Sequence, residues 1–346
     1  NITFTDVFKL DINSRISLSN NDSGTNNTVF GYQAGNAIAS GTNSNVLVGY
    51  QSGLALNSGD ANVIIGTSAG DAMTSASSNV AIGGSALGAS TDIDKAVCIG
   101  NDAMQAVATS AADGTVAIGA TALFALTSGA ENVAVGYEAG KAQTTGDGNT
   151  VIGYNAFKSA DGTEGSNVVI GKAAGQSINH DSSHQNVIIG SGAMAGGTAQ
   201  QNNNVAVGYF ALGSIANNAQ AGTVAVGSNA LGALTSGSGC LAVGYLSGKN
   251  ITTGADNVGI GEKTIGGNSS TAITGDANTA VGWSAGSNLE GAAANNTLIG
   301  KNSGFAMTTG SGNVAVGKSA GDSINVGGDN VALGMNALGA LTTGDR

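Results

Sequence analysis

Residues 79–83 read Asn-Val-Ala-Ile-Gly, and this unit of Asn, three apolar residues and Gly recurs eighteen times, with a few substitutions, between Asn27 and Gly334. The closing glycines lie 17 to 19 residues apart, with one gap of 21. Such a period is typical of stacked coils that bury their apolar faces only against their neighbours. The short β-branched runs between turn residues predict strands. We therefore expect an all-β chain, a β-solenoid (β-roll) of about 18 coils with a repeat of 17 to 19 residues.

The unbroken repeat predicts one solenoid domain over residues 27–346. Residues 1–26 precede it, and their alternating apolar residues predict a strand pair, a cap or a connection to another module. The last complete coil is followed directly by Arg346 without a visible cap. Because an open solenoid end is an adhesive sheet edge, we expect this chain to be a segment of a longer protein.

Two apolar columns, one and three residues before each repeat glycine, share a face of the predicted strands because side chains alternate with a period of two. We expect this face to form the interior. The column between them then points outward, yet it carries no polar or charged side chain. Monomers rarely expose so continuous an apolar stripe, so we expect it to be the interface between chains. The predicted interface residues are Val29, Leu47, Ile64, Ala81, Cys98, Ala117, Ala134, Val151, Val169, Ile188, Ala206, Ala225, Ala242, Ala280, Leu298, Ala315 and Ala332.

Asn stands four residues before the glycine in fourteen of the eighteen coils, where it marks the turn into the strand. Stacked side-chain amides can pair along such a column; a comb of amides that binds a ligand is the alternative. The glycine itself supplies a positive φ or room for the chain above and below. A small residue three positions after the glycine predicts a tight corner of the coil.

The composition excludes several classes of protein. The formal net charge is −11 and the eleven basic residues are scattered singly, which argues against nucleic-acid binding because that needs a basic groove or stripe. No apolar run approaches the ~20 residues of a membrane span, so we expect no membrane insertion. Cys98 and Cys240 are eight coils apart, too far for a disulfide at ~4.8 Å per coil.

All six tyrosines and the single tryptophan directly follow a repeat glycine: Tyr32, Tyr50, Tyr137, Tyr154, Tyr209, Tyr245 and Trp283. One interpretation is structural, with rings that cover the strand ends or line a groove between chains. The other is a sugar-stacking surface that contacts a cell-surface glycan. Two tyrosine pairs lie in adjacent coils, and we expect the rings of each pair to stack at about the ~4.8 Å spacing of the coils.

The candidates for chemistry are weak. A row of acidic residues near the Asn column suggests calcium at the coil edge: Asp60, Glu131, Asp147, Asp256, Asp276 and Asp329. The tandem calcium-repeat signature is absent, and Asp in a Gly-rich turn needs no metal. His180 and His184 stand four apart in a polar loop, a weak zinc pattern, and we expect them to be solvent-exposed. We find no nucleophile triad, phosphate loop or dinucleotide fingerprint, and predict no catalytic residue, metal or cofactor.

The stretches Ser78-Asn-Val-Ala-Ile-Gly-Gly-Ser-Ala86 and Thr115-Val-Ala-Ile-Gly-Ala-Thr-Ala122 resemble the head repeats of YadA-like trimeric autotransporter adhesins, and similar repeats occur in phage tail fibres. The resemblance implies a left-handed, homotrimeric β-roll. The coils here are longer than the adhesin repeat, and the sequence contains neither a coiled-coil stalk nor a membrane anchor. These differences favour a virion fibre over a bacterial surface protein.

We therefore predict a non-enzymatic structural protein: the shaft of a homotrimeric phage tail fibre on the virion surface, which holds a receptor-binding tip away from the particle for host attachment. Its partners are then further copies of itself and further fibre domains of the same chain. The alternative is an extracellular adhesin on a bacterial cell surface that binds glycans or host surfaces through the aromatic column. A depolymerising tailspike needs paired carboxylates in a groove, for which the sequence offers no convincing pair.

Overall fold

A computed structural model describes residues 26–106, 108–215, 218–340 and 342–344, together with the backbone of two short strands near the N-terminus. These are β1 (Lys9–Leu10) and β2 (Ile16–Ser17), which pair antiparallel. The rest of the predicted N-terminal segment lies outside the described residues, as do Asp345 and Arg346. The chain divides into two compact units, Asn1–Thr163 and Glu164–Arg346.

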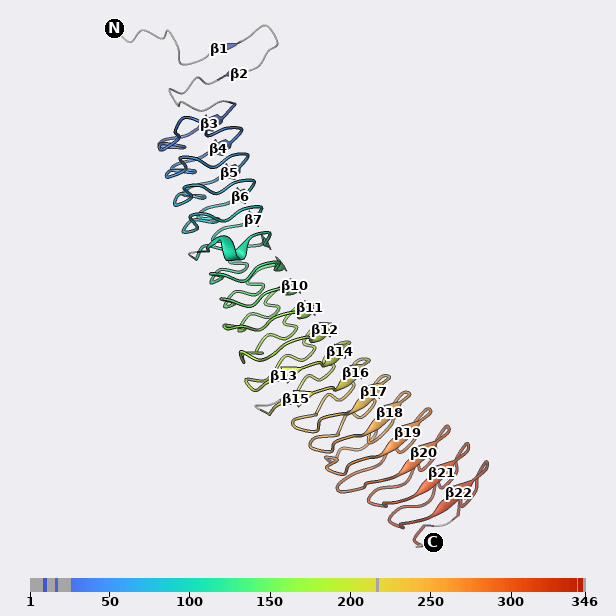
Figure 1. The fold of residues 1–346 in the computed structure, drawn as a ribbon. Helices are drawn as coiled ribbons and strands as arrows, with labels where there is room; N and C mark the ends of the chain where they lie inside the picture. The colour runs from blue at the N-terminus through green and yellow to red at the C-terminus, as the bar shows by residue number, and fades with distance from the viewer. Residues whose placement is uncertain are drawn as a thin grey trace, which may run out of the picture. The chain divides into compact units, whose positions relative to one another are not determined.

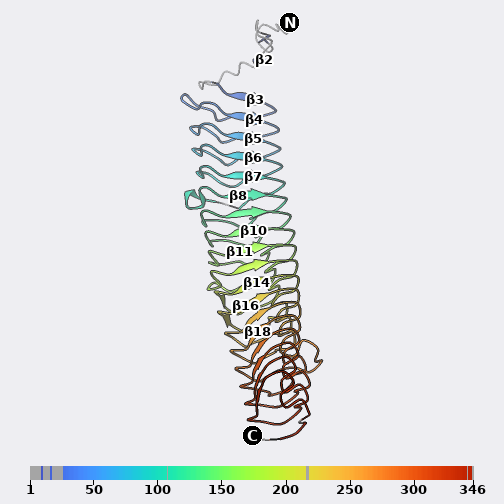
Figure 2. The same cartoon turned by 90° about the vertical axis from the view of Figure 1, so that its right-hand side faces the viewer.

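Among its described residues, the first unit stacks eight three-residue strands, each of which pairs in parallel with the next one along the chain (Figures 1 and 2). A single 3₁₀ turn, η1 (Ser110–Ala112), lies in the coil that leads to the sixth of them. The strands are β3 (Thr28–Phe30), β4 (Val46–Val48), β5 (Val63–Ile65), β6 (Val80–Ile82), β7 (Val97–Ile99), β8 (Val116–Ile118), β9 (Val133–Val135) and β10 (Thr150–Ile152).

The described part of the second unit repeats this arrangement with ten strands, again parallel and each paired with the next. Two further strands, β13 (Gln201–Asn202) and β15 (Gln220–Ala221), form a second parallel pair beside the main ladder. The ten are β11 (Val168–Ile170), β12 (Val187–Ile189), β14 (Val205–Val207), β16 (Val224–Val226), β17 (Leu241–Val243), β18 (Val258–Ile260), β19 (Thr279–Val281), β20 (Thr297–Ile299), β21 (Val314–Val316) and β22 (Val331–Leu333).

Each strand pairs with the equivalent residues one coil later; Val80, Ala81 and Ile82, for example, face Val97, Cys98 and Ile99. The repeat period is therefore the length of one coil, as the sequence predicts. The protein is an all-β solenoid, which confirms that part of the predicted fold class, and the left-handed coil and the homotrimer stay predictions.

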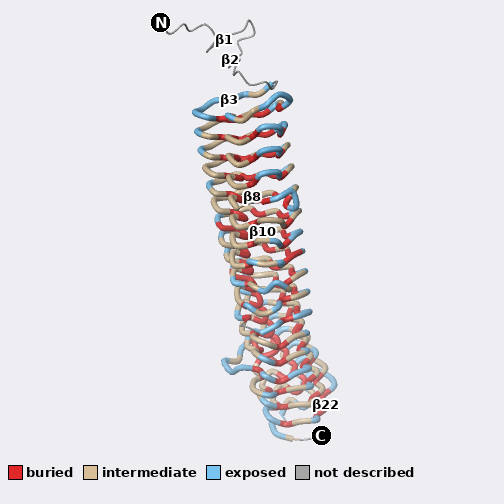
Figure 3. The backbone as a smooth tube through the Cα atoms, turned by 60° about the vertical axis from the view of Figure 1, so that its left-hand side comes forward, coloured by how far each residue is buried: buried red, intermediate tan, exposed pale blue. Residues whose placement is uncertain are grey.

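The structure contradicts the predicted orientation of the strands. The middle residue of nearly every strand is buried inside its own coil, while its two neighbours are only half-buried and face outward (Figure 3). The residues assigned to the interface between chains are thus core residues. They are Val29, half-buried in the first coil, and the buried Leu47, Ile64, Ala81, Cys98, Ala117, Ala134, Val151, Val169, Ile188, Ala206, Ala225, Ala242, Ala280, Leu298, Ala315 and Ala332.

The physical reason is the narrow interior of the coil. The middle column faces a second wall, where a large side chain comes either from four or from seven residues after the repeat glycine. In the coil after β6 it is Leu87, at the first of these positions; in the coil after β5 it is Met73, at the second. When the first position is Gly70, an added Cβ would lie 2.6 Å from the Met73 sulfur. Large side chains opposite most strands, with both positions filled in the coil of Leu123 and Leu126, leave room for Ala in many of the strands.

The Asn column forms a hydrogen-bonded ladder in the interior. Asn62 donates from Nδ2 to Asn45 Oδ1 at 3.0 Å and to the carbonyl of Ala76 in the next coil at 2.8 Å. The backbone N–H and Nδ2 of Asn79 then donate to Asn62 Oδ1. The same bonds recur along Asn257, Asn278, Asn296, Asn313 and Asn330. Apart from the half-buried Asn27, the column is buried, so it holds coils together and is not a ligand comb.

The repeat glycine meets both conditions that the sequence suggests. Gly83 has a φ of 132°, and a Cβ added to it would collide with the carbonyl oxygen of Gly100 in the next coil. The corner of the coil also places large residues at positive φ, such as Leu87 at 53° and Met104 at 50°. This backbone is costly for L-residues, and their full burial offsets that cost.

Candidate functional site

The outward face of the strands is the first candidate. It carries the two columns one and three residues before the repeat glycine, here called the outer strip. Its members are almost all Val, Ile, Leu or Thr, and none is charged. Most are half-buried because the coils above and below cover part of each side chain, and Ile152, Ile260 and Ile299 remain more than a third exposed. Each unit therefore presents a continuous apolar strip along its ladder.

The aromatic column borders this strip. Its side chains keep between 45% and 69% of their surface exposed. The expected stacking is confirmed: the ring centroids of Tyr32 and Tyr50 lie 5.7 Å apart at 12°, and those of Tyr137 and Tyr154 lie 5.3 Å apart at 17°. In the second unit, the ammonium of Lys301 lies 4.9 Å from the ring centroid of Trp283. The column reaches solvent, as the sequence indicates.

A compact ion-pair cluster lies beside the Tyr137–Tyr154 pair. The Glu138 carboxylate is nearly buried, and its two oxygens accept from Lys141 and Lys158 at 2.6 Å each. These hydrogen bonds hold the pKa of Glu138 below its usual range, and Glu138 raises the pKa of Lys158. The sequence offered no signal for this cluster because Lys158 belongs to the next coil.

Two members of the predicted acidic row accept hydrogen bonds from backbone N–H groups. Asp60 Oδ1 accepts from the N–H of Asn43 at 2.5 Å, and Asp276 Oδ1 accepts from the N–H of Ala255 at 2.7 Å. Glu131, Asp256 and Asp329 instead occupy positions with a φ near +57° at the turn into the strand. Among the described residues, none of the six predicted calcium candidates belongs to a group of three close metal-ligating side chains.

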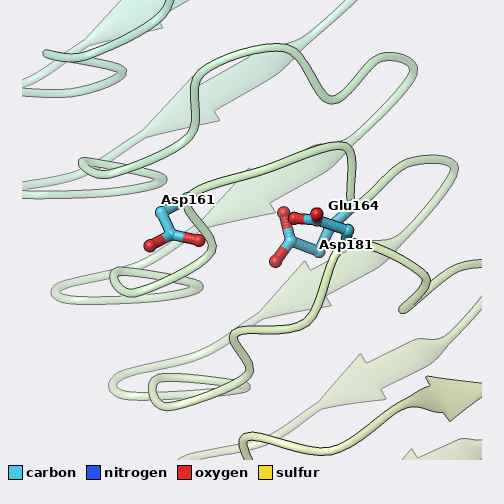
Figure 4. Close-up of side chains that lie close together, drawn as sticks. All are labelled: Asp161, Glu164 and Asp181. Atoms are coloured by element: carbon cyan, nitrogen blue, oxygen red, sulfur yellow. The ribbon is translucent and has the colours of Figure 1, made fainter.

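The second unit does bring two other carboxylates together (Figure 4). One oxygen of Glu164 lies within 4.8 Å of one oxygen of Asp181. Glu164 is fully buried and accepts a hydrogen bond from the backbone N–H of His180 at 3.0 Å. Figure 4 also draws Asp161, which belongs to the first unit. Because Glu164 already caps a backbone N–H, the arrangement has a structural explanation and we assign no metal to it.

The two histidines also bond to the backbone. His184 Nδ1 accepts from the N–H of Gly165 at 2.9 Å, and His180 Nδ1 accepts from the N–H of Ser182 at 3.2 Å. His180 is exposed, as predicted, whereas His184 is half-buried. Each imidazole thus has a structural partner on the nitrogen that would otherwise be free for a metal.

The two cysteines are free and buried. Cys98 fills the middle column of β7, and Cys240 takes an Asn position, where its Sγ lies 3.3 Å from the carbonyl oxygen of Gly254. Burial raises the pKa of both thiols, which keeps them protonated and unreactive at neutral pH. They are interior fillers, as the sequence suggests.

Comparison with protein-family models, curated proteins and solved structures finds no match to this chain. None of its described segments forms a helix with the length and apolarity that crossing a membrane requires. The outer strip and the aromatic column thus remain the main candidate surfaces for function.

Proposed function

We propose that this chain is a structural shaft whose copies associate through the outer strip, in the manner of a phage tail fibre. The observation that carries the proposal is the strip itself: two uncharged, largely β-branched columns that repeat in every coil. In a chain with a formal charge of −11, an uncharged contact surface avoids placing like charges directly opposite one another. The strip is such a surface.

The size of the strip suits association. At ~4.8 Å per coil and ~3.3 Å per strand residue, the strip covers about 400 Å² in the first unit and about 500 Å² in the second. The two areas add up to about 900 Å², which is similar to the roughly 800 Å² per partner of a standard interface. A second copy is the partner that repeats the same spacing coil after coil. The copy number of three, the left-handed coil and the extracellular, virion-surface location follow from the resemblance to trimeric adhesin heads and tail fibres.

The mechanism of a shaft is mechanical, and the proposed protein needs no catalytic residue or cofactor. Parallel backbone pairing and the Asn ladder resist separation of neighbouring coils. Association of copies through the outer strip then stiffens the assembly further. Such a rod holds other fibre domains of the same chain at a distance from the particle.

Val80 and Val97, which face each other in the outer strip on β6 and β7, allow a direct test. Changing both to Glu places two negative charges in the strip, so we expect analytical ultracentrifugation to show loss of trimers while circular dichroism stays native. Ser75→Glu, at an exposed turn of the same coil as β6, is the matched control and is expected to assemble. Unchanged trimers of the double variant would contradict the proposal.

Ala81 lies between Val80 and Ile82 but points into the coil. Ala81→Glu is therefore expected to unfold the protein, because it buries an unpaired charge. A folded, disassembled Ala81→Glu variant would instead restore the original assignment of the middle column to the interface.

A second candidate function, glycan binding by a bacterial surface adhesin, rests on the exposure of the aromatic column. Changing Tyr137 and Tyr154 to Ser removes one stacked pair. A shaft predicts a lower melting temperature and no change in signal on a glycan array. The adhesin would be favoured if the parent chain binds a glycan and this variant loses that binding at an unchanged melting temperature.

A further inference from the structure

Three polar side chains stand out in the interior of the second unit. Gln201, Gln220 and Thr223 are each at most 1% exposed. The two glutamines face each other in the parallel pair of β13 and β15. They lie seven residues before the repeat glycine, where most other coils carry Gly or Ala, such as Gly237 and Ala293. Two long amide side chains therefore occupy space that holds little or no side chain in most other coils.

These residues hold a concentration of unpaired polar atoms. Gln201 Oε1, both amide atoms of Gln220 and Thr223 Oγ1 have no hydrogen-bond partner, and they are four of the nine such buried atoms among the described residues. An unpaired buried polar group costs about 1–3 kcal/mol. Gln201 pairs with Gln220 on the neighbouring strand, and Thr223 follows Gln220 by three residues, so these atoms call for a shared partner in the interior.

Gln220 does not repeat the bonds of its neighbour. Gln201 Nε2 donates to the carbonyls of Ala199, two residues earlier, and of Asn218 in the next coil, at 3.1 Å each. The equivalent carbonyls for Gln220 are those of Asn218 and Thr235. The first already accepts from Gln201, and the second accepts from Asn218 Nδ2 at 3.4 Å.

Thr223 differs in the same way from the other substitutes in the Asn column. Thr115 Oγ1 reaches the carbonyl of Gly129 in the next coil at 3.5 Å, and Cys240 Sγ reaches that of Gly254 at 3.3 Å. Thr223 Oγ1 makes no such bond. Coil length does not explain this difference, because nineteen residues separate the repeat glycines around Thr223 and around Thr115 alike.

We propose that this coil encloses an ordered water molecule held by the Gln220 amide, the Thr223 hydroxyl and Gln201 Oε1. Water matches the site because it offers two donors and two acceptors, and buried waters typically make about three hydrogen bonds to otherwise unpaired groups. A site that needs both donors and acceptors suits water better than a metal ion, which accepts only lone pairs. The site belongs to a single chain and is independent of any assembly.

Magnetic relaxation dispersion of ¹⁷O counts long-lived waters in the folded protein. We expect the variant Gln220→Leu/Thr223→Val to lose one long-lived water per chain relative to the parent. Thr115→Val, in the matching position of the first unit, is the control and is expected to lose none. An equal count in the parent and the double variant would overturn the proposal.

A density map of the parent protein at about 2 Å resolution provides a second measurement. It does not require the double variant to fold. We expect a water peak within hydrogen-bond distance of the Gln220 amide and the Thr223 hydroxyl. A direct amide-to-amide bond between Gln201 and Gln220, with no water peak beside Thr223, would show that the side chains satisfy each other and would refute the site.

Discussion

The second unit contains two runs of successive coils that have the same backbone pairing but differ in the residues of the Asn column. From β18 to β22 the column is Asn in five successive coils, whose amides bond one to the next at 2.9–3.1 Å. At β16 and β17 the column is Thr223 and Cys240. Even so, these two strands pair in the same parallel register as those of the continuous stretch. The register of the strands therefore does not require the Asn amides, and the ladder adds hydrogen bonds to buried groups.

The largest loss of stability is expected when an Asn is replaced where the ladder is continuous. Asn296 donates to Asn278 Oδ1 and to the carbonyl of Gly310, and accepts from Asn313. Asn296→Ala leaves these groups unpaired in the core, so we expect a loss of about 3 kcal/mol in the free energy of unfolding. Urea denaturation measures it. The exposed Asn268 provides the control, Asn268→Ala, which should change stability by less than about 0.5 kcal/mol. Equal effects at both sites would refute the role of the ladder.

A smaller gain is expected where the ladder is interrupted. Cys240→Asn offers an acceptor to Asn257 and retains a donor for the carbonyl of Gly254, so we expect about 1 kcal/mol of added stability. Cys240→Ala, which offers neither, should lower stability below that of the parent. Thermal or urea unfolding of the three proteins tests this order. A less stable Asn variant would mean that the interrupted stretch cannot accommodate the ladder geometry.

The smallest effect on stability is expected from the ion pairs of Glu138, and its dependence on pH distinguishes it from the effect of the Asn ladder. Amides do not titrate, so the loss caused by Asn296→Ala should be the same at pH 3 and pH 7. The pKa of Glu138 is lowered by Lys141 and Lys158, so its contribution is present above its unfolded pKa of about 4.3 and is lost as the pH falls through the folded value. Because the lysines are partly exposed, we expect about 0.5 kcal/mol at most.

Glu138→Gln is the variant that measures this contribution. It should lower stability slightly at pH 7, and this loss should shrink as the pH falls through the lowered folded pKa of Glu138. A loss that stays constant as the pH is lowered would indicate that Glu138 acts through packing and not through its charge.

Much of the fold could be predicted because each repeat carries the same local signals. The spacing of glycines such as Gly83 predicted the coil length, and the β-branched runs predicted the strands. The stacking of Tyr137 on Tyr154 followed from their equivalent positions in adjacent coils. The Asn ladder followed in the same way. These features depend on residues that are one period apart, and the period is visible in the sequence.

The candidate sites were less predictable. The pairing of Glu138 with Lys158 and the approach of Glu164 to Asp181 depend on how turns of unequal composition align in neighbouring coils. Gln201 and Gln220 are polar residues in turn-rich stretches, where exposure is the ordinary expectation, yet they lie in the core. Nothing in the local pattern distinguishes a polar side chain that points into the coil from one that points out.

The sequence by itself determined that the chain is a stack of parallel β coils, because periodicity and turn chemistry are local properties. It also determined that Val80 and Ile82 share one face of a strand and that Ala81 lies on the other. Only the tertiary structure decided which face is inside. Both faces are apolar, so alternation alone could not choose between them. The choice depends on the narrow interior, where a large side chain such as Leu87 leaves space for Ala81 and turns the branched residues outward.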